Sequence, residues 1–222
     1  SEDFMFWNDF MNKGKHYTQK VLVKTTMEQA AAILHSGGTT GTPKNIVLTN
    51  GNFNALSKQA AIVFPKIKSG DSMLTILPLF HCFGLCVCVH AVMCLHGGVT
   101  LIPQFDAKRI NKLFSKYKPT LVAGVPTLYE ALLTNKYMDN MDLSYVKYCI
   151  CGGDSLTEAK NIELNRFMDS HGVQNHIIQG YGMTETCGPV VAGTMGSNKP
   201  GIIGIPLPGN DMKIVNIDTK EE

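Results

Sequence analysis

The chain has 222 residues, of which 44% are hydrophobic and 17% are charged, and its formal net charge is +2. This composition is typical of a folded protein with a sizeable core, and it excludes a chain that is disordered throughout. The charges are nearly balanced and no basic block occurs, which argues against nucleic acid as the main partner.

The seven cysteines are an odd number, and no Cys-x-x-Cys pair occurs among them. Cys82 and Cys86 are one helical turn apart, so a metal site is one interpretation. Because most of the cysteines lie in apolar runs, we favour small core residues in a reducing compartment. The first residues are acidic and the longest apolar run falls short of the about 20 residues that span a bilayer. We therefore expect a cytoplasmic protein with no transmembrane segment.

Short β-rich runs alternate with helical patterns along the chain. We predict strands at residues 31–35, 45–49, 72–77, 99–102, 120–124, 146–151, 176–180 and 211–216. We predict helices at residues 52–64, 83–95, 107–117, 127–133 and 157–170. The helix at residues 83–95 is apolar on nearly all sides and should be buried. The alternation predicts an α/β domain with mainly parallel sheets flanked by helices.

Ligands of such sheets bind beyond the carboxyl ends of the strands, so the loops at those ends are candidate sites. They comprise residues 36–44, 78–84, 124–127, 151–155 and 180–188.

The first loop runs Ser36-Gly37-Gly38-Thr39-Thr40-Gly41-Thr42-Pro43-Lys44 and offers backbone N–H groups, hydroxyls and one cation. These donors suit a phosphate chain. A Walker A loop is excluded because its lysine follows a glycine, and Pro43 stands there instead. The dinucleotide fingerprint is excluded because the loop lacks G-x-G-x-x-G spacing. An ordinary hairpin loop rich in turn formers remains the alternative.

The second informative loop reads QGYGMTETCG at residues 179–188. Gly180 and Gly182 flank Tyr181 and allow a ligand to approach closely, so the ring could stack on a purine. Thr184 offers a hydroxyl for phosphate, and Glu185 offers a carboxylate for a hard cation such as Mg²⁺. A lone Tyr or Glu in a loop is usually only a surface residue. Together with the first loop, these residues indicate a Mg-nucleotide site.

HSGGTTGTPK and GYGMTETCG resemble the AMP-binding signatures of the adenylate-forming superfamily. That superfamily includes acyl- and aryl-CoA synthetases, the adenylation domains of peptide synthetases, and luciferases. LPLFHCFGL, GVPTLYEAL, CGGDSL and GIIGIPLPGNDMKIVN resemble further family segments in the same order. The resemblance implies that residues 1–222 form the central part of the large N-terminal AMP-binding domain, without the C-terminal lid domain.

The resemblance implies a two-step reaction with ATP, Mg²⁺ and CoA. A carboxylate attacks the α-phosphorus of ATP to give acyl-AMP and pyrophosphate, and the thiol of CoA then displaces AMP. Cations and N–H donors must offset the repulsion between the carboxylate and the triphosphate. The catalytic residues it implies are Lys44, His81, Thr184 and Glu185.

The resemblance also assigns binding roles. It implies that the ATP phosphates are bound by Ser36, Gly37, Gly38, Thr39, Thr40, Gly41, Thr42, Lys44 and Thr184. It implies that the adenine is bound by Gly152, Gly153, Asp154, Gly180, Tyr181 and Gly182, although the family usually has a small residue at the position of Asp154. It implies that Glu185 binds the metal. It implies that the acyl pocket is lined by His81, Phe83, Gly84, Val125, Pro126 and Thr127.

His81 has two interpretations. A histidine beside apolar residues is more often a hydrogen-bonded core residue than a functional one. Within PLFHCFG, however, it matches a histidine that lies beside the carboxylate and the thiol route in acyl-CoA synthetases. We therefore expect His81 to orient the substrate or gate its route.

The segment PLFHCFG also bears on the class of acid. Amino-acid-activating members carry an aspartate in this region that pairs with the substrate ammonium, and here no acid is present. Because an unpaired buried ammonium is costly, a fatty or aryl acid is favoured over an amino acid. The alternatives are an amino-acid adenylation domain and a non-catalytic nucleotide-binding remnant. The family's ribose-binding aspartate, hinge arginine and lid lysine cannot be matched, so we expect the chain alone to be inactive.

Overall fold

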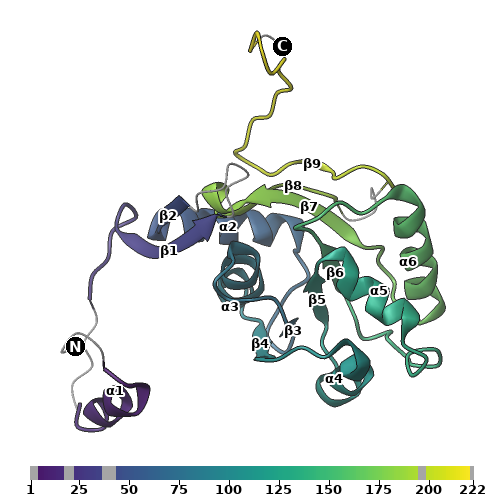
Figure 1. The fold of residues 1–222 in the computed structure, drawn as a ribbon, viewed down its shortest axis with the longest axis horizontal. Helices are drawn as coiled ribbons and strands as arrows, with labels where there is room; N and C mark the ends of the chain where they lie inside the picture. Colours follow the sequence, from purple (N-terminus) through teal and green to yellow (C-terminus); the bar gives the residue numbers. More distant parts are fainter. Residues whose placement is uncertain (1–4, 18–22, 37–43, 195–198, 221–222) are drawn as a thin grey trace.

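The computed structural model describes residues 5–17, 23–36, 44–194 and 199–220. Its described part contains a large sheet, a separate hairpin and the helices that pack on them (Figure 1). The hairpin pairs β1 (Ala30–Ser36) with β2 (Lys44–Thr49) antiparallel. The strand order of the large sheet is β4-β3-β5-β6-β7-β8-β9.

The first five strands in that order pair in parallel, and the last two add antiparallel. The parallel strands are β3 (Ser72–Thr75), β4 (Gly98–Leu101), β5 (Leu121–Gly124), β6 (Tyr148–Cys151) and β7 (Ile178–Met183). The added strands are β8 (Gly188–Ala192) and β9 (Ile205–Pro206). The predicted mainly parallel α/β sheet is therefore confirmed.

The helices occupy both faces of the sheet. One face carries α2 (Asn50–Val63), the π-helix η1 (Phe83–Ala91) and α3 (Val92–Cys94); the other carries the 3₁₀ turn η2 (Ala107–Arg109), α4 (Ile110–Tyr117), α5 (Pro126–Thr134) and α6 (Glu158–Ser170). The remaining elements are α1 (Trp7–Gly14), which has no buried residue, and the 3₁₀ turn η3 (Thr184–Thr186). No described helix is both long and apolar enough to cross a membrane.

The core follows the period of two that a strand imposes on its side chains. In β6, Tyr148 and Ile150 pack toward α2 and η1, whereas Cys149 and Cys151 pack toward α5 and α6. All four are buried, as expected for central strands of a sheet covered on both faces. The space between the sheet and helices α4, α5 and α6 is filled by the large side chains of Phe114, Tyr129 and Leu164.

Some expectations were wrong in detail. Residues 211–216 form no strand and are exposed, and Ile214 is 91% exposed, because they have no strand partner in the described chain. The segment at 83–95 is a π-helix followed by one α-helical turn, and its last residues Met93 and Cys94 are exposed. β7 continues three residues beyond the predicted end at residue 180.

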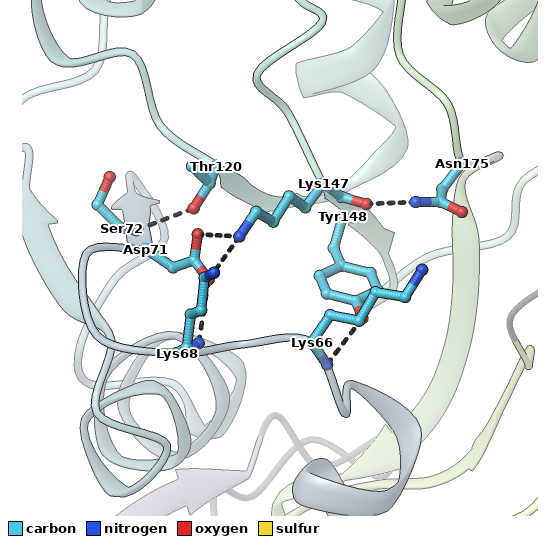
Figure 2. A network of polar contacts seen from close by, with 8 residues as sticks. All are labelled: Lys66, Lys68, Asp71, Ser72, Thr120, Lys147, Tyr148 and Asn175. Atoms are coloured by element: carbon cyan, nitrogen blue, oxygen red, sulfur yellow. Dashed lines mark hydrogen bonds and ion pairs between the residues drawn. The ribbon is translucent and has the colours of Figure 1, made fainter.

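At the amino-terminal edge of the parallel sheet, polar side chains form a network (Figure 2). The Lys147 ammonium lies 2.7 Å and 2.9 Å from the two carboxylate oxygens of Asp71, whose second oxygen also accepts the backbone N–H of Lys68. Thr120 accepts the N–H of Ser72, and Asn175 donates to the Lys147 carbonyl. These bonds join the starts of β3, β5, β6 and β7.

Candidate functional site

The β1–β2 hairpin lies against the η3 turn. Ser36, the last residue of β1, is paired in register with Lys44, the first residue of β2. Both strands contact η3, which carries Thr184 and Glu185. The structure thus packs the hairpin that flanks the predicted phosphate loop against the turn that carries the predicted metal residue. The loop between the strands, Gly37, Gly38, Thr39, Thr40, Gly41, Thr42 and Pro43, lies outside the described part of the chain.

The η3 turn is fixed by its own hydrogen bonds. The N–H of Cys187 donates to the Thr184 carbonyl at 3.0 Å. The Thr186 hydroxyl donates to the Gly188 carbonyl at 2.7 Å and accepts the N–H of Met183 at 3.1 Å. Thr184 is buried, whereas Glu185 is exposed and its carboxylate pairs with no other described residue. The turn therefore holds the Glu185 carboxylate toward solvent, and both strands that flank the predicted phosphate loop contact this turn.

Glu185 suits Mg²⁺ bound together with phosphate. Within the described residues, no group of three or more His, Cys, Asp or Glu side chains could hold a metal by itself. Mg²⁺ usually takes one or two carboxylates and completes its shell with water and substrate phosphates. A single carboxylate on the turn beside the hairpin fits that requirement, whereas the described residues offer no all-protein metal site.

The two predicted adenine segments lie backbone against backbone. Gly152 follows β6 and packs on β7, where a Cβ added to Gly152 would come within 3.0 Å of the Gly180 carbonyl oxygen. A Cβ on Gly182 would overlap the backbone of Gly188, so β7 and β8 approach closely only with glycine there. Tyr181 is 44% exposed, and Asp154 is exposed with one carboxylate oxygen accepting the N–H of Ser155 at 2.7 Å.

An apolar pocket lies between α2, η1 and the ends of β6, β7 and β8. It is lined by Leu56, Ala60, Val63, Phe64, His81, Cys82, Phe83, Val87, Ala91, Ile150, Cys151, Gly152, Gly153, Ile178, Gln179, Gly180, Gly182, Gly188, Pro189, Ala192 and Leu207. Tyr181 is not in the lining although both its neighbours are. The tyrosine ring is thus outside the pocket lining and partly open to solvent.

The pocket overlaps only part of the predicted acyl set. His81 and Phe83 line it, whereas Gly84, Val125, Pro126 and Thr127 do not. The backbone of Gly84 packs against the Pro78 carbonyl, and the Val125 side chain packs against Gly153. The sequence analysis did not predict that α2 forms one wall of the pocket with Leu56, Ala60 and Val63. Their spacing of four and three residues places them on one helix face, and this spacing could have indicated a shared wall.

His81 lies at the pocket and is exposed. The backbone N–H of Phe83 donates to its Nδ1 at 3.2 Å, so the neutral ring carries its proton on Nε2. The His81 carbonyl accepts the N–H of Leu85, which ties the residue to the first turn of η1. The imidazole is thereby held in one orientation, with Nε2–H available to a ligand.

Three buried thiols lie beneath the η3 turn. Burial raises the pKa of the Cys82 thiol, and a hydrogen bond with the Thr184 hydroxyl partly opposes this rise. Interaction with Cys187 raises the pKa of Cys86, and the same interaction lowers the pKa of Cys187. All three cysteines are buried in one apolar cluster, as the prediction of small core residues requires.

Comparison with known proteins gives consistent matches. The family model described as "AMP-binding enzyme" matches residues 3–222. A long-chain-fatty-acid–CoA ligase of Bacillus subtilis is 35% identical over 195 residues, which cover 86% of this chain and 34% of that protein. A luciferin 4-monooxygenase of Nipponoluciola cruciata is 32% identical over 196 residues, which cover 87% of this chain and 35% of that protein.

Among solved structures, the anthranilate CoA ligase AuaEII in complex with anthranoyl-AMP matches with a TM-score of 0.87 and 24% identity. That match covers 100% of this chain and 42% of the other, and at this identity it shows the fold alone. The chain thus spans about a third of the length of the curated relatives reported above.

Proposed function

The chain belongs to the AMP-binding enzyme family, and from that premise we propose that it is part of an AMP-forming acid–thiol ligase. In the proposed reaction, a carboxylate attacks the α-phosphorus of ATP and releases pyrophosphate. The thiol of CoA then attacks the acyl carbon of the acyl-AMP and releases AMP. The observation that carries the proposal is the contact of the β1–β2 hairpin, which carries Lys44, with the η3 turn near an apolar pocket.

The roles proposed for the residues follow from their placement. Lys44 supplies positive charge to the β- and γ-phosphates, and Thr184 donates a hydroxyl hydrogen bond to a phosphate oxygen. Glu185 would hold Mg²⁺, which when bound supplies charge that shields the phosphates. Tyr181, which is partly open to solvent, stacks on the adenine. His81 directs Nε2–H toward the acid carboxylate.

The pocket supports a fatty or aryl acid as the substrate. Its described lining contains no Asp or Glu, so an amino acid's ammonium would be buried there without a counter-charge. The lining is mostly aliphatic and aromatic, which suits an alkyl chain or ring. The names of the relatives, a fatty-acid–CoA ligase among them, are consistent with this choice.

Thioester formation by the longest natural chain that carries this sequence tests the proposal. A panel of saturated fatty acids, aryl acids and free amino acids would be offered with ATP, Mg²⁺ and CoA. We expect acyl-CoA with fatty or aryl acids and none with amino acids. Turnover of amino acids alone would contradict the assignment and favour an amino-acid adenylation domain.

A matched pair of variants links the acid to the pocket. Ala60 lies on the pocket side of α2, so Ala60→Phe should reduce activity with long acids more than with short ones. Ala55 is exposed on the same helix, so Ala55→Phe adds the same ring without entering the pocket. Equal effects of the two variants on chain-length preference would place the acid elsewhere.

We also propose that these 222 residues alone bind ATP weakly and form almost no thioester. The chain spans about a third of its relatives' length, and closure of a further segment would be needed to exclude water from the site. Calorimetry with ATP–Mg²⁺ and a thioester assay on this chain test the idea. Turnover near that of the longest natural chain would contradict it.

A further inference from the structure

An imidazole and a thiol meet at the exposed end of the helix that runs through η1 and α3. The Sγ atom of Cys94, the last residue of α3, lies 3.5 Å from Nε2 of His90 in the last turn of η1. The two residues are four positions apart, so they share one face of the helix. Of the seven cysteines, all of which lie in the described ranges, Cys94 alone is exposed. The pair is therefore open to a ligand from solvent.

The pair is separate from the site described above. Val87 and Ala91 on the same helix line the apolar pocket, whereas His90 and Cys94 do not. The proposed reaction gives neither residue a role. A buried thiol on this helix, Cys88, packs toward the sheet instead.

The ring of His90 is held in place by Phe53 of α2. The two ring centroids are 5.0 Å apart and the ring planes meet at 83°, which is an edge-to-face contact. Phe53 is itself buried in the apolar cluster between α2, η1 and the hairpin. An imidazole fixed in this way loses little conformational freedom when it binds a ligand.

We propose that His90 and Cys94 form a surface binding site for a transition-metal cation such as Zn²⁺. Thiolate and imidazole together suit Zn²⁺, whereas Mg²⁺ prefers oxygen ligands. Tetrahedral Zn²⁺ has bonds of about 2.3 Å to sulfur and about 2.0 Å to nitrogen, which set the two ligand atoms about 3.5 Å apart. The distance of 3.5 Å between Sγ and Nε2 matches that separation, so the two atoms are spaced to share one ion.

The site is open, with two protein ligands. Among the described residues, no group of three or more His, Cys, Asp or Glu side chains could hold a metal, so water completes the coordination shell. Binding releases the Cys94 proton to solvent, because the thiolate is the form that binds metals. The carboxyl end of a helix carries partial negative charge, which favours a cation at this place.

Two measurements on the longest natural chain that carries this sequence, kept reduced and in excess Mg²⁺, test the site without any assay of activity. Co²⁺, a spectroscopic substitute for Zn²⁺, should give a thiolate-to-cobalt charge-transfer band that added Zn²⁺ removes. Zn²⁺ should also slow the alkylation of Cys94, followed by mass spectrometry. At ten times the dissociation constant the alkylation rate should fall by about tenfold, because the unbound thiol is the reactive species. A chelator should restore the rate.

Matched variants identify the ligands. His90→Phe keeps a ring against Phe53 but removes the nitrogen, so the Zn²⁺ concentration needed for protection should rise by at least about tenfold, the cost of losing even an outer partner of a metal ligand. His96→Asn removes an exposed histidine nearby, where φ is 64° and asparagine is tolerated, and should leave protection unchanged. Cys94→Ala should abolish the cobalt band. Cys88→Ala should keep it.

Three results would overturn the proposal. The first is alkylation of Cys94 that Zn²⁺ does not slow, which would leave the pair as a hydrogen bond only. The second is a cobalt spectrum without a band that depends on Cys94. The third is equal protection in the parent and in folded His90→Phe, with folding checked by circular dichroism. If His90→Phe fails to fold, the cobalt band and the protection of Cys94 in the parent decide the question.

Discussion

At the amino-terminal edge of the parallel sheet the polar side chains bond to one another, whereas at the carboxyl-terminal edge they face solvent or the pocket. Asp71 at the first edge is 4% exposed and its oxygens accept from Lys147 and from the N–H of Lys68 (Figure 2). Glu185 at the second edge is exposed, and among the described residues its carboxylate has no partner.

The difference separates two uses of charge in one sheet. A buried carboxylate must be paired, because removing it from water is costly, and the paired group then fixes the starts of the strands. An exposed carboxylate carries little of that cost and keeps its oxygens for a ligand. The first edge should therefore control stability, and the second should control activity.

The largest expected effect comes from Lys44, the first residue of β2 in the hairpin that contacts η3 at the carboxyl-terminal edge. Lys44→Ala should lower adenylation by about 10²-fold or more if its charge acts mainly in the transition state. The side chain is exposed, so the unfolding temperature should hardly change. Lys58→Ala, which removes an exposed lysine from α2, is the control. Pyrophosphate exchange measures the rates, and equal rates for the two variants would remove Lys44 from the mechanism.

Glu185→Gln should have the next largest effect. The amide keeps the shape of the side chain but lacks the charge that Mg²⁺ prefers, so the Mg²⁺ concentration for half-maximal rate should rise. Stability should stay that of the parent. A Mg²⁺ titration of the exchange rate checks this, with Glu158→Gln, a change at the start of α6, as the control. If the titration curves of parent and Glu185→Gln coincide, Glu185 is not a ligand.

At the opposite edge, Lys147→Ala should lower the free energy of unfolding by about 2 kcal/mol. Breaking a fully buried ion pair costs roughly 3–5 kcal/mol, and Lys147 is partly exposed, so less is lost. Lys160→Ala breaks the exposed pair with Glu163 and should lower the free energy of unfolding much less than Lys147→Ala does. Urea denaturation measures the free energy of unfolding of both variants. If the two variants lost similar amounts of this free energy, the stability of the fold would not depend on the pairing of Asp71 with Lys147.

A smaller effect is expected from pH at the same edge. Burial opposes the charged form of Asp71, but hydrogen bonds from Lys147 and Lys68 outweigh it and hold its pKa below the ordinary value. Its stabilising contribution is thus fully present above the unfolded pKa of about 4 and is lost as the pH falls through the folded value. Asp71→Asn should flatten the dependence of unfolding free energy on pH below about 4. An unchanged slope would contradict this account.

The parallel part of the fold could be predicted because each central strand is a short apolar run between helical patterns. β8 could not, since CGPVVA contains a glycine and a proline that are typical of loops. Proline is tolerated there because β8 pairs with β7 at an irregularity in register. The π-helical turn of η1 was also beyond sequence reasoning, because a segment that is apolar on all sides has no periodicity to measure.

The candidate site could be proposed from the sequence where a loop motif carries its own chemistry, as at Lys44 and Glu185, and those roles stay predictions. The pocket was not, because its α2 wall comes together with β6 and β8 only after folding.

Acid-dependent ATP–pyrophosphate exchange by Lys44→Ala and Lys147→Ala, measured well below both unfolding temperatures, tests the separation of the two edges most directly. The account predicts that Lys44→Ala loses about 10²-fold or more while Lys147→Ala stays within about twofold of the parent despite its lower stability. Loss of exchange in folded Lys147→Ala, with Lys44→Ala unaffected, would contradict it.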